Sequence, residues 1–280
     1  MAFEADVLLD KTIAALTAPG GQFELVTAKV RGADYPTFKA APDSLRDYLA
    51  VFFMAQGDKE FLVYRDERMT FAQVYAQAVH IAAVLQHRHG IAKGDRVAVA
   101  MRNYPEWVSA FVAGCILGAV VVPINAWWTA EELAYGIADS GTRLVIADEE
   151  RARRLAGNPV KVLTVRTSKA VADELGRVRL EDELEVAPKT PWYLPPIGPE
   201  DDATIMYTSG STGNPKGAVA TQRSVVTGAL NYLVAGLAML QMSQAAGVTL
   251  PEQQGMLLNV PLFPITGSVP AMLVSIAIGR

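Results

Sequence analysis

The chain has 280 residues, of which 25 are basic and 29 acidic, giving a formal charge of −4. With 51% apolar and 19% charged residues it is too hydrophobic to be disordered, and its single cysteine excludes a disulfide scaffold. The negative charge and the lack of a Lys/Arg-rich run argue against nucleic acid as a partner. Charge is also uneven, because the last 78 residues carry four charged side chains: Lys216, Arg223, Glu252 and Arg280.

Three uncharged runs are long enough to raise the question of a membrane span: residues 107–130, 224–251 and 253–279. Each is interrupted by proline or amide side chains, whose polar groups would be costly in lipid. We therefore predict no transmembrane segment and keep a membrane protein as the minor alternative. The first ten residues carry three acidic side chains and no basic run ahead of an apolar core, which does not fit a secretory signal and indicates the cytoplasm.

Neither the cysteine nor the histidines indicate a reactive or metal site. Cys115 lies in an apolar helical context, where a thiol behaves as a small hydrophobe. His80, His87 and His89 fall near the end of one predicted helix before Gly90, where cationic side chains favour the negative helix end. We expect no zinc site and no Ser-His-Asp triad, and no metal held by this chain.

Helices and strands alternate along the first half of the chain. Ser44 or Asp43 caps a helix over 45–54, and residues 61–64 form a short strand. Thr70 and Gln73 form a capping box, ahead of apolar residues at helical spacing. The following elements are then a strand at 96–101, a helix from Pro105 to Gly118, a strand at 119–124, a helix opened by the Thr129–Glu132 capping box and ended near Gly141, and a strand at 143–147.

Strands separated by helices of this length form right-handed crossovers, so the predicted fold class is α/β, with parallel sheets layered with helices. Residues 143–185 hold 18 charges in 43 positions and include a strand at 160–165, which places this segment at an exposed sheet edge. Five prolines then mark a connection. We expect an N-terminal α/β subdomain over 1–187, a Pro-rich connection over 188–202 and a phosphate-loop subdomain over 203–280.

The most specific segment follows an apolar strand at 203–207 and has the sequence Thr-Ser-Gly-Ser-Thr-Gly-Asn-Pro-Lys-Gly over 208–217. Its glycines let backbone N–H groups converge on one anion, while hydroxyls and an ammonium add donors without any acidic residue. That composition favours a polyphosphate ligand. It is not a Walker A loop, because Lys216 lies between Pro215 and Gly217. A plain flexible linker is the alternative, although a linker needs no rigid proline beside its lysine.

The segment from Tyr207 to Gly217 resembles the phosphate-loop signature of the AMP-forming acyl-CoA synthetase superfamily. Residues 101–107 (Met-Arg-Asn-Tyr-Pro-Glu-Trp) and 121–128 (Val-Val-Pro-Ile-Asn-Ala-Trp-Trp) resemble fatty-acyl-CoA ligases in particular. The resemblance runs from about Ala41 to the end. It implies the large-domain fold of an adenylate-forming enzyme and a two-step reaction, in which a carboxylate attacks ATP to give acyl-AMP and CoA then displaces AMP.

The resemblance also implies roles for individual residues. The phosphates of ATP would be held by Thr208, Ser209, Gly210, Ser211, Thr212 and Gly213, with Lys216 neutralising charge during catalysis. Alternatively, Lys216 merely stiffens the loop by bonding carbonyl groups. The expected small molecules are ATP, Mg²⁺, CoA as co-substrate and an apolar carboxylic acid, and a homo-oligomer stays open.

The acid side is expected after the loop. Residues 225–246 indicate a helix that either packs on the sheet or lines an acyl tunnel. The run 261–267 resembles the family's Pro-Leu-Phe-His-x-x-Gly segment on the acyl and CoA route, which would involve Phe263, Pro264, Thr266 and Gly267. Pro264 replaces the family's histidine, and Gln222 stands where relatives often have histidine, so both departures affect the substrate details.

Other family segments do not follow Lys216, including the Tyr-Gly-x-Thr-Glu motif, the ribose-binding aspartate and the lysine of the small C-terminal domain. Residues 135–139 echo the first of these but indicate a helix. We expect the 280 residues to be the N-terminal part of a longer ligase, incomplete at the C-terminus and inactive alone. The alternatives are an amino-acid- or aryl-acid-activating enzyme of the same superfamily and a non-catalytic nucleotide-binding module.

Overall fold

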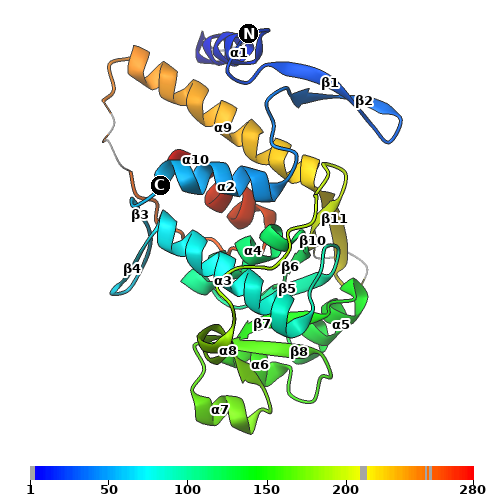
Figure 1. Ribbon diagram of the computed structural model, residues 1–280. Coiled ribbons are helices and arrows are strands. Elements are labelled where there is room, and N and C mark those ends of the chain that lie inside the picture. The colour runs from blue at the N-terminus through cyan, green and yellow to red at the C-terminus, as the bar shows by residue number, and fades with distance from the viewer. Residues whose placement is uncertain (1–3, 209–212, 250, 252–253) are drawn as a thin grey trace.

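The architecture is taken from a computed structural model that describes residues 4–208, 213–249, 251 and 254–280 (Figure 1). Within these residues, seven strands form one sheet in the order β11-β10-β6-β5-β7-β8-β9. β10 and β11 pair antiparallel, and every other neighbouring pair is parallel. The strands are β5 (Arg96–Ala100), β6 (Val120–Pro123), β7 (Leu144–Asp148), β8 (Lys161–Val165), β9 (Val178–Arg179), β10 (Asp202–Thr208) and β11 (Lys216–Thr221).

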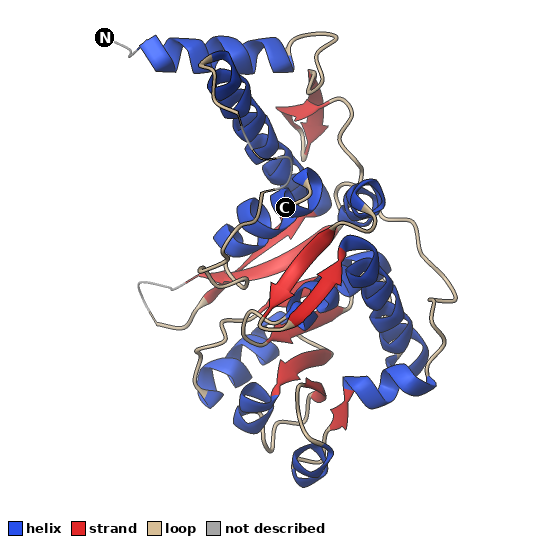
Figure 2. Cartoon of the chain, turned by 90° about the vertical axis from the view of Figure 1, so that its left-hand side faces the viewer, coloured by secondary structure: helices blue, strands red, loops and turns tan. Residues whose placement is uncertain are grey.

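Helices cover both faces of this sheet, as Figure 2 shows. α4 (Pro105–Leu117), α5 (Ala130–Ser140) and α6 (Glu149–Arg154) follow β5, β6 and β7 in turn. Because side chains alternate along a strand, Val97 and Val99 join the core under α4, whereas Ala98 and Ala100 join a second core under α5 and α6. The predicted α/β fold with a mainly parallel sheet is confirmed.

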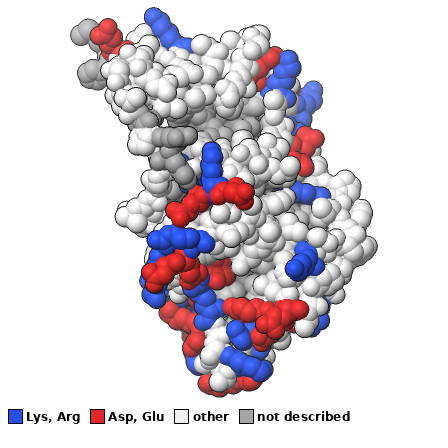
Figure 3. Space-filling model, turned by 60° about the vertical axis from the view of Figure 1, so that its left-hand side comes forward, with Lys and Arg blue, Asp and Glu red and all other residues white. Residues whose placement is uncertain are grey.

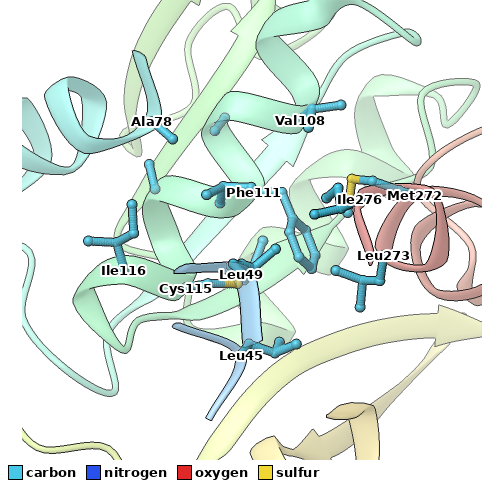
Figure 4. Close-up of a cluster of buried hydrophobic side chains, with 14 of the residues drawn as sticks. Leu45, Leu49, Ala78, Val108, Phe111, Cys115, Ile116, Met272, Leu273 and Ile276 are labelled. Atoms are coloured by element: carbon cyan, nitrogen blue, oxygen red, sulfur yellow. The ribbon is translucent and has the colours of Figure 1, made fainter. Parts of the chain in front are cut away.

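α4 is the central helix, and apart from Glu106 its sequence is uncharged, which follows from its burial. Every residue of α4 except Glu106 is buried. α4 lies between the sheet and the helices α2 (Leu45–Gln56) and α3 (Phe71–His89), and Figure 4 shows Phe111 and Cys115 packed among side chains of these helices and of the C-terminal segment. Gly114 permits this close approach, since a Cβ there would lie 2.6 Å from a methyl of Val121.

Local capping sets the ends of these helices as the sequence predicts. Side-chain caps open α2, α3 and α5, and the latter two have full capping boxes. Glycines with positive φ close α3, α4 and α5. The capping residues are Ser44, Thr70 with Gln73, and Thr129 with Glu132, and the closing glycines are Gly90, Gly118 and Gly141.

Two hairpins stand apart from the main sheet. β1 (Leu25–Val30) pairs with β2 (Ala33–Phe38) and, together with α1 (Glu4–Thr17), lies at one end of the molecule beside α9 (Gln222–Ala245), as Figures 1 and 2 show. β3 (Glu60–Tyr64) pairs with β4 (Glu67–Thr70). The strand expected at 61–64 therefore exists, but it belongs to a separate hairpin.

The charged segment forms the flank of the molecule. β8, β9, α7 (Lys169–Glu174) and α8 (Leu180–Val186) lie at this end of the sheet, with β9 at the edge. In Figure 3 acidic and basic side chains gather at the lower end, while the upper part of this face has few. Residues 188–201 contain no helix or strand, and β10 then joins the same sheet as β5–β9. The subdomain division at 188–202 stays a prediction.

The C-terminal part returns to the core. The π-helix η1 (Gly267–Leu273) and α10 (Val274–Ile278) pack near α2, where the Tyr48 hydroxyl donates to the carbonyl oxygen of Leu273 at 3.0 Å. Among the described helices, α9 alone is long and apolar enough to cross a membrane by length and composition, and 39% of its most apolar window is buried. This is weak grounds for a membrane span, because the core helix of a soluble protein passes the same test.

Candidate functional site

The candidate site lies at the carboxyl edge of the parallel strands. Because β5, β6, β7 and β10 run in the same direction, the residues that follow each of them emerge at one edge of the sheet. These are the turn after β5 at 101–104, the turn after β6 at 124–129, and the loop after β10 that contains the phosphate-loop motif. Ligands of open α/β sheets bind at this edge.

The β10–β11 hairpin presents the ends of the phosphate-loop motif. Thr208 and Lys216 face each other as antiparallel partners, and the Thr208 hydroxyl donates to the carbonyl oxygen of Lys216 at 3.5 Å. Both residues are exposed. Gly213 has φ 121°, a conformation that favours glycine. Ser209, Gly210, Ser211 and Thr212 lie outside the described residues, so their phosphate-binding role stays a prediction.

Tyr207 anchors the start of this loop to α5. Its hydroxyl donates to Asp139 Oδ2 at 2.6 Å and contacts the Gly136 carbonyl oxygen at 3.0 Å. Burial, and secondarily the Asp139 carboxylate, raise the pKa of Tyr207 above its ordinary value, so the phenol stays protonated. The Tyr207 ring lies edge-on to Trp128 at 5.3 Å, and a Cβ at Gly136 would meet the Trp128 ring at 2.6 Å. Residues 135–139 are helical as predicted, yet Asp139 has a role at the site that sequence reasoning missed.

The expected acid-side segment reaches the same edge. Phe263 lies edge-on to Trp127, with ring centroids 5.4 Å apart at 85°. Trp127 is 62% exposed, and its backbone N–H donates to Asn125 Oδ1 at 2.9 Å. Since Trp127 adjoins the Trp128 that packs on Tyr207, two consecutive tryptophans connect the acid-side segment with the base of the phosphate loop.

Gly267 has a steric role in that segment. A Cβ at Gly267 would lie 1.8 Å from the Pro261 carbonyl oxygen, so only glycine lets the chain fold back on itself here. The Pro264 carbonyl oxygen accepts the backbone N–H groups of Gly267 and Ser268 at 3.0 and 3.1 Å, which starts η1. Thr266 is exposed and makes no side-chain cap. The acyl and CoA roles of Phe263, Pro264, Thr266 and Gly267 stay predictions.

A buried ion pair supports the edge between these loops. Arg151 and Asp148 are 2% and 4% exposed, and Arg151 Nη1 contacts both Asp148 oxygens at 3.1 and 2.9 Å. Asp148 also accepts the Arg102 N–H at 3.1 Å, and Arg151 Nε donates to the Ala126 carbonyl oxygen at 2.7 Å. The pair thereby joins the turns after β5 and β6 to the end of β7.

Gln222, expected from the family resemblance to stand at a histidine position, serves the scaffold. It is 1% exposed, and its Oε1 accepts the backbone N–H of Leu45 at 2.8 Å, which pairs an otherwise unbonded group at the start of α2. This contact joins the first turns of α2 and α9. No sequence periodicity could have predicted it, because the two residues are 177 positions apart.

The helix expected at 225–246 is confirmed as α9, and a cavity of about 1080 Å³ lies along it. Its lining comes from α9, α2, the β1–β2 region and the C-terminal residues, and includes Leu233, Leu237 and Phe52. None of its lining residues belongs to the described turns after β5, β6 or β10. The acyl-tunnel role of α9 stays a prediction.

The described residues bring together no group of three or more His, Cys, Asp or Glu side chains that could hold a metal ion. Cys115 is 2% exposed, and burial raises its pKa, which suits a packing role. His80 and His87 contact the carbonyl oxygens of Ala187 and Thr190, beside the Pro-rich connection.

Comparison with known proteins identifies relatives over most of the chain. The family model described as AMP-binding enzyme matches residues 51–280. Long-chain-fatty-acid–CoA ligase FadD13 of Mycobacterium tuberculosis strain H37Rv is 35% identical over 205 residues, covering 71% of this chain and 36% of the relative. 2-Succinylbenzoate–CoA ligase of Geobacillus kaustophilus is 38% identical over 207 residues, covering 72% and 36%. The chain thus spans about a third of these relatives.

Solved structures agree with these matches. The inhibitor-bound N-terminal domain of FACL13 from Mycobacterium tuberculosis superposes with a TM-score of 0.65 and 30% identity, covering 85% of this chain and 56% of that one. The anthranilate CoA ligase AuaEII, in complex with anthranoyl-AMP, has a TM-score of 0.67 at 21% identity and shows the shared fold. The family model, which matches residues 51–280, shows that this chain belongs to the AMP-binding enzyme family.

Proposed function

We propose that these residues supply the phosphate-binding and acid-facing parts of an ATP-dependent acid–CoA ligase whose acid is apolar, with fatty acids as the leading class. The observation that carries the proposal is the β10–β11 hairpin. It holds Thr208 opposite Lys216 at the carboxyl edge, next to the Trp127–Phe263 pair.

In the first step, a carboxylate oxygen of the acid attacks the α-phosphorus of ATP, and the bond to the β-phosphate oxygen breaks, so pyrophosphate leaves. Negative charge grows on the leaving group. Thr208, Ser209, Ser211, Thr212, the Gly210 and Gly213 amides and Lys216 would hold that group, with the described ends of the loop set by β10 and β11. Donors placed where charge develops lower the barrier.

In the second step, the CoA thiolate attacks the acyl carbonyl carbon of acyl-AMP, and AMP departs with the electron pair of the broken acyl–oxygen bond. This chain contributes the wall formed by Trp127 and Phe263. Mg²⁺ bound to the phosphates of ATP would add positive charge where the leaving group forms. The described residues bring together no group of three or more His, Cys, Asp or Glu side chains that could hold it.

The acid class is tested with the full-length protein. It is supplied with ATP, Mg²⁺, CoA and a panel of fatty, aryl and amino acids, and pyrophosphate and acyl-CoA are measured. Aryl acids are the second candidate, because the 2-succinylbenzoate ligase is as similar to this chain as the fatty-acid ligase. Turnover of fatty acids supports the proposal, and turnover restricted to aryl or amino acids overturns it. The 280 residues alone are expected to yield no acyl-CoA.

Lys216 is tested by Lys216→Met in the same protein. Loss of one charge-stabilising donor is expected to lower the rate of pyrophosphate formation about 100-fold while thermal stability is kept. If Lys216 merely stiffens the loop, stability falls and the rate follows it. Lys189→Met, at an exposed position of the Pro-rich connection, is the matched control and should change neither quantity.

A further inference from the structure

Asn103 makes two hydrogen bonds to a segment 157 and 159 positions away. It lies in the turn directly after β5 and is half-buried. Its Nδ2 donates to the Val260 carbonyl oxygen at 2.7 Å, and its Oδ1 accepts the backbone N–H of Leu262 at 2.9 Å. One carboxamide therefore pairs both backbone groups that flank Pro261, and we call this pair of bonds the Asn103 clamp.

This pairing has the pattern of a parallel strand. In a parallel ladder, one residue donates to the carbonyl before its partner and accepts from the N–H after it. The Asn103 side chain likewise donates to the carbonyl oxygen before Pro261 and accepts the N–H after it. Pro261 itself has no N–H that would need a partner. Aspartate could accept but not donate, and alanine could do neither. An asparagine amide is thus specifically matched to this backbone.

The paired segment is also held from two other sides. Leu262 is 2% exposed and belongs to the main core. Gly267 packs directly against the Pro261 carbonyl oxygen from behind. Asn103 closes the side that faces the carboxyl edge of the sheet, and the next residue after Leu262 is Phe263, whose ring meets Trp127.

The phosphate loop is anchored separately. It is held through Tyr207 and Asp139 and through the β10–β11 pairing, and Asn103 takes part in none of these contacts. Loss of the Asn103 amide would therefore loosen the Phe263 wall while leaving the ends of the phosphate loop in place.

We propose that Asn103 is a positioning residue for the acid side of the site, acting through the backbone of residues 260–262 on Phe263. This rests on the ligase function proposed above, and it assigns to Asn103 the task of holding the acid-facing wall in register with the sheet edge.

The Asn103 clamp is tested first in the 280-residue chain by amide hydrogen exchange. In Asn103→Ala the Leu262 N–H should exchange at least about tenfold faster, since its acceptor is gone. Asn103→Asp should keep most of that protection at neutral pH, because a carboxylate still accepts. Asn158→Ala is the matched control: Asn158 also accepts a backbone N–H, that of Val160 at 3.0 Å, but lies just before β8 at the other edge of the sheet.

The positioning role is tested in the full-length protein by steady-state kinetics. Asn103→Ala should raise KM for the acid at least about tenfold, with KM for ATP changed less than about twofold, and Asn103→Asp should fall between it and the wild type. A merely structural loss would change both KM values together or reduce the amount of folded enzyme.

The outcomes separate the two proposals. An active wild-type enzyme whose Asn103→Ala variant keeps Leu262 protection, or shows equal changes in both KM values, overturns the positioning role and leaves the ligase function intact. A wild-type enzyme that activates no acid overturns the ligase function and the positioning role with it, while faster exchange at Leu262 would still support the Asn103 clamp.

Discussion

The ion pairs around α6 and the contacts of residues 260–273 stabilise the molecule in different ways. Around α6, ion pairs join residues three or four positions apart: Arg151 with Asp148, Arg153 with Glu149, and Arg154 with Glu150. Residues 260–273 carry no charged side chain and rely on neutral hydrogen bonds between distant residues, such as Tyr48 to Leu273 and Asn103 to Val260. Ion pairs within α6 can form from the local sequence. The bonds of Arg151 to Ala126 and of Asp148 to Arg102, and those of residues 260–273, form only when remote segments meet.

The largest effect is expected where the flank's charge is buried. Arg151→Ala would leave Asp148 buried without its cation, at a cost of about 3–5 kcal/mol in the free energy of unfolding. Urea unfolding followed by circular dichroism measures it. Arg153→Ala removes two exposed ion pairs, with Glu149 and Glu174, and should lower the free energy of unfolding far less, because exposed pairs are screened by water. Equal losses in the two variants would show that burial does not separate these pairs.

Gly267→Ala tests the close approach of Gly267 to Pro261 by adding a methyl group. The added Cβ meets the Pro261 carbonyl oxygen, so the backbone must shift, at a cost of about 2–3 kcal/mol. Gly255→Ala is the control, because a Cβ at Gly255 meets no atom within 4 Å and its φ is not positive. Thermal unfolding of both variants measures the difference. A Gly267→Ala protein as stable as the wild type would contradict the close approach.

Gln222→Met tests a long-range neutral contact. The Leu45 N–H would lose its acceptor in a buried place, which should lower the free energy of unfolding by about 1–2 kcal/mol. Gln241→Met, at an exposed position of the same helix, should change it by less than about 0.5 kcal/mol. Urea unfolding compares them, and matching midpoints would rule out a stabilising role for the Gln222 amide.

Glu67 combines the two kinds of contact, because it forms an ion pair, as around α6, but with a residue 99 positions away. Arg166, after β8, binds both Glu67 oxygens at 2.8 and 2.7 Å and lowers the pKa of that carboxyl below its ordinary value. A lowered pKa stabilises the fold above the unfolded pKa of about 4.3, and this is lost as the pH falls through the folded value. Since Glu67 is 47% exposed, Glu67→Gln should cost less than about 1 kcal/mol at pH 7.

The measurement is urea unfolding of wild type and Glu67→Gln between pH 7 and pH 3. The difference between the two proteins should shrink towards the acidic end, as the Glu67 carboxylate becomes protonated. A difference that stays constant over this range would mean that Glu67 does not contribute through its charge.

Many helix boundaries follow from short-range sequence patterns alone. Thr70 with Gln73 and Thr129 with Glu132 predict helix starts, and Gly90 and Gly141 predict helix ends. These interactions span three or four residues, so helix geometry alone decides them. The loop at 208–217 is recognisable for a related reason, because glycines, hydroxyls and a lysine occur in one short run.

The tertiary structure decided the rest. By its sequence the strand at 61–64 could have joined the main sheet, and only the structure shows that it pairs with β4 instead. The contacts of Asn103 with Val260, Asp139 with Tyr207 and Gln222 with Leu45 leave no periodic trace, because each joins residues at least 68 positions apart. Gly267 is a further example, because the need for glycine there is explained only by the Pro261 carbonyl oxygen that packs against it. Local geometry sets which elements form, and the packing of distant segments sets which side chains meet at the site.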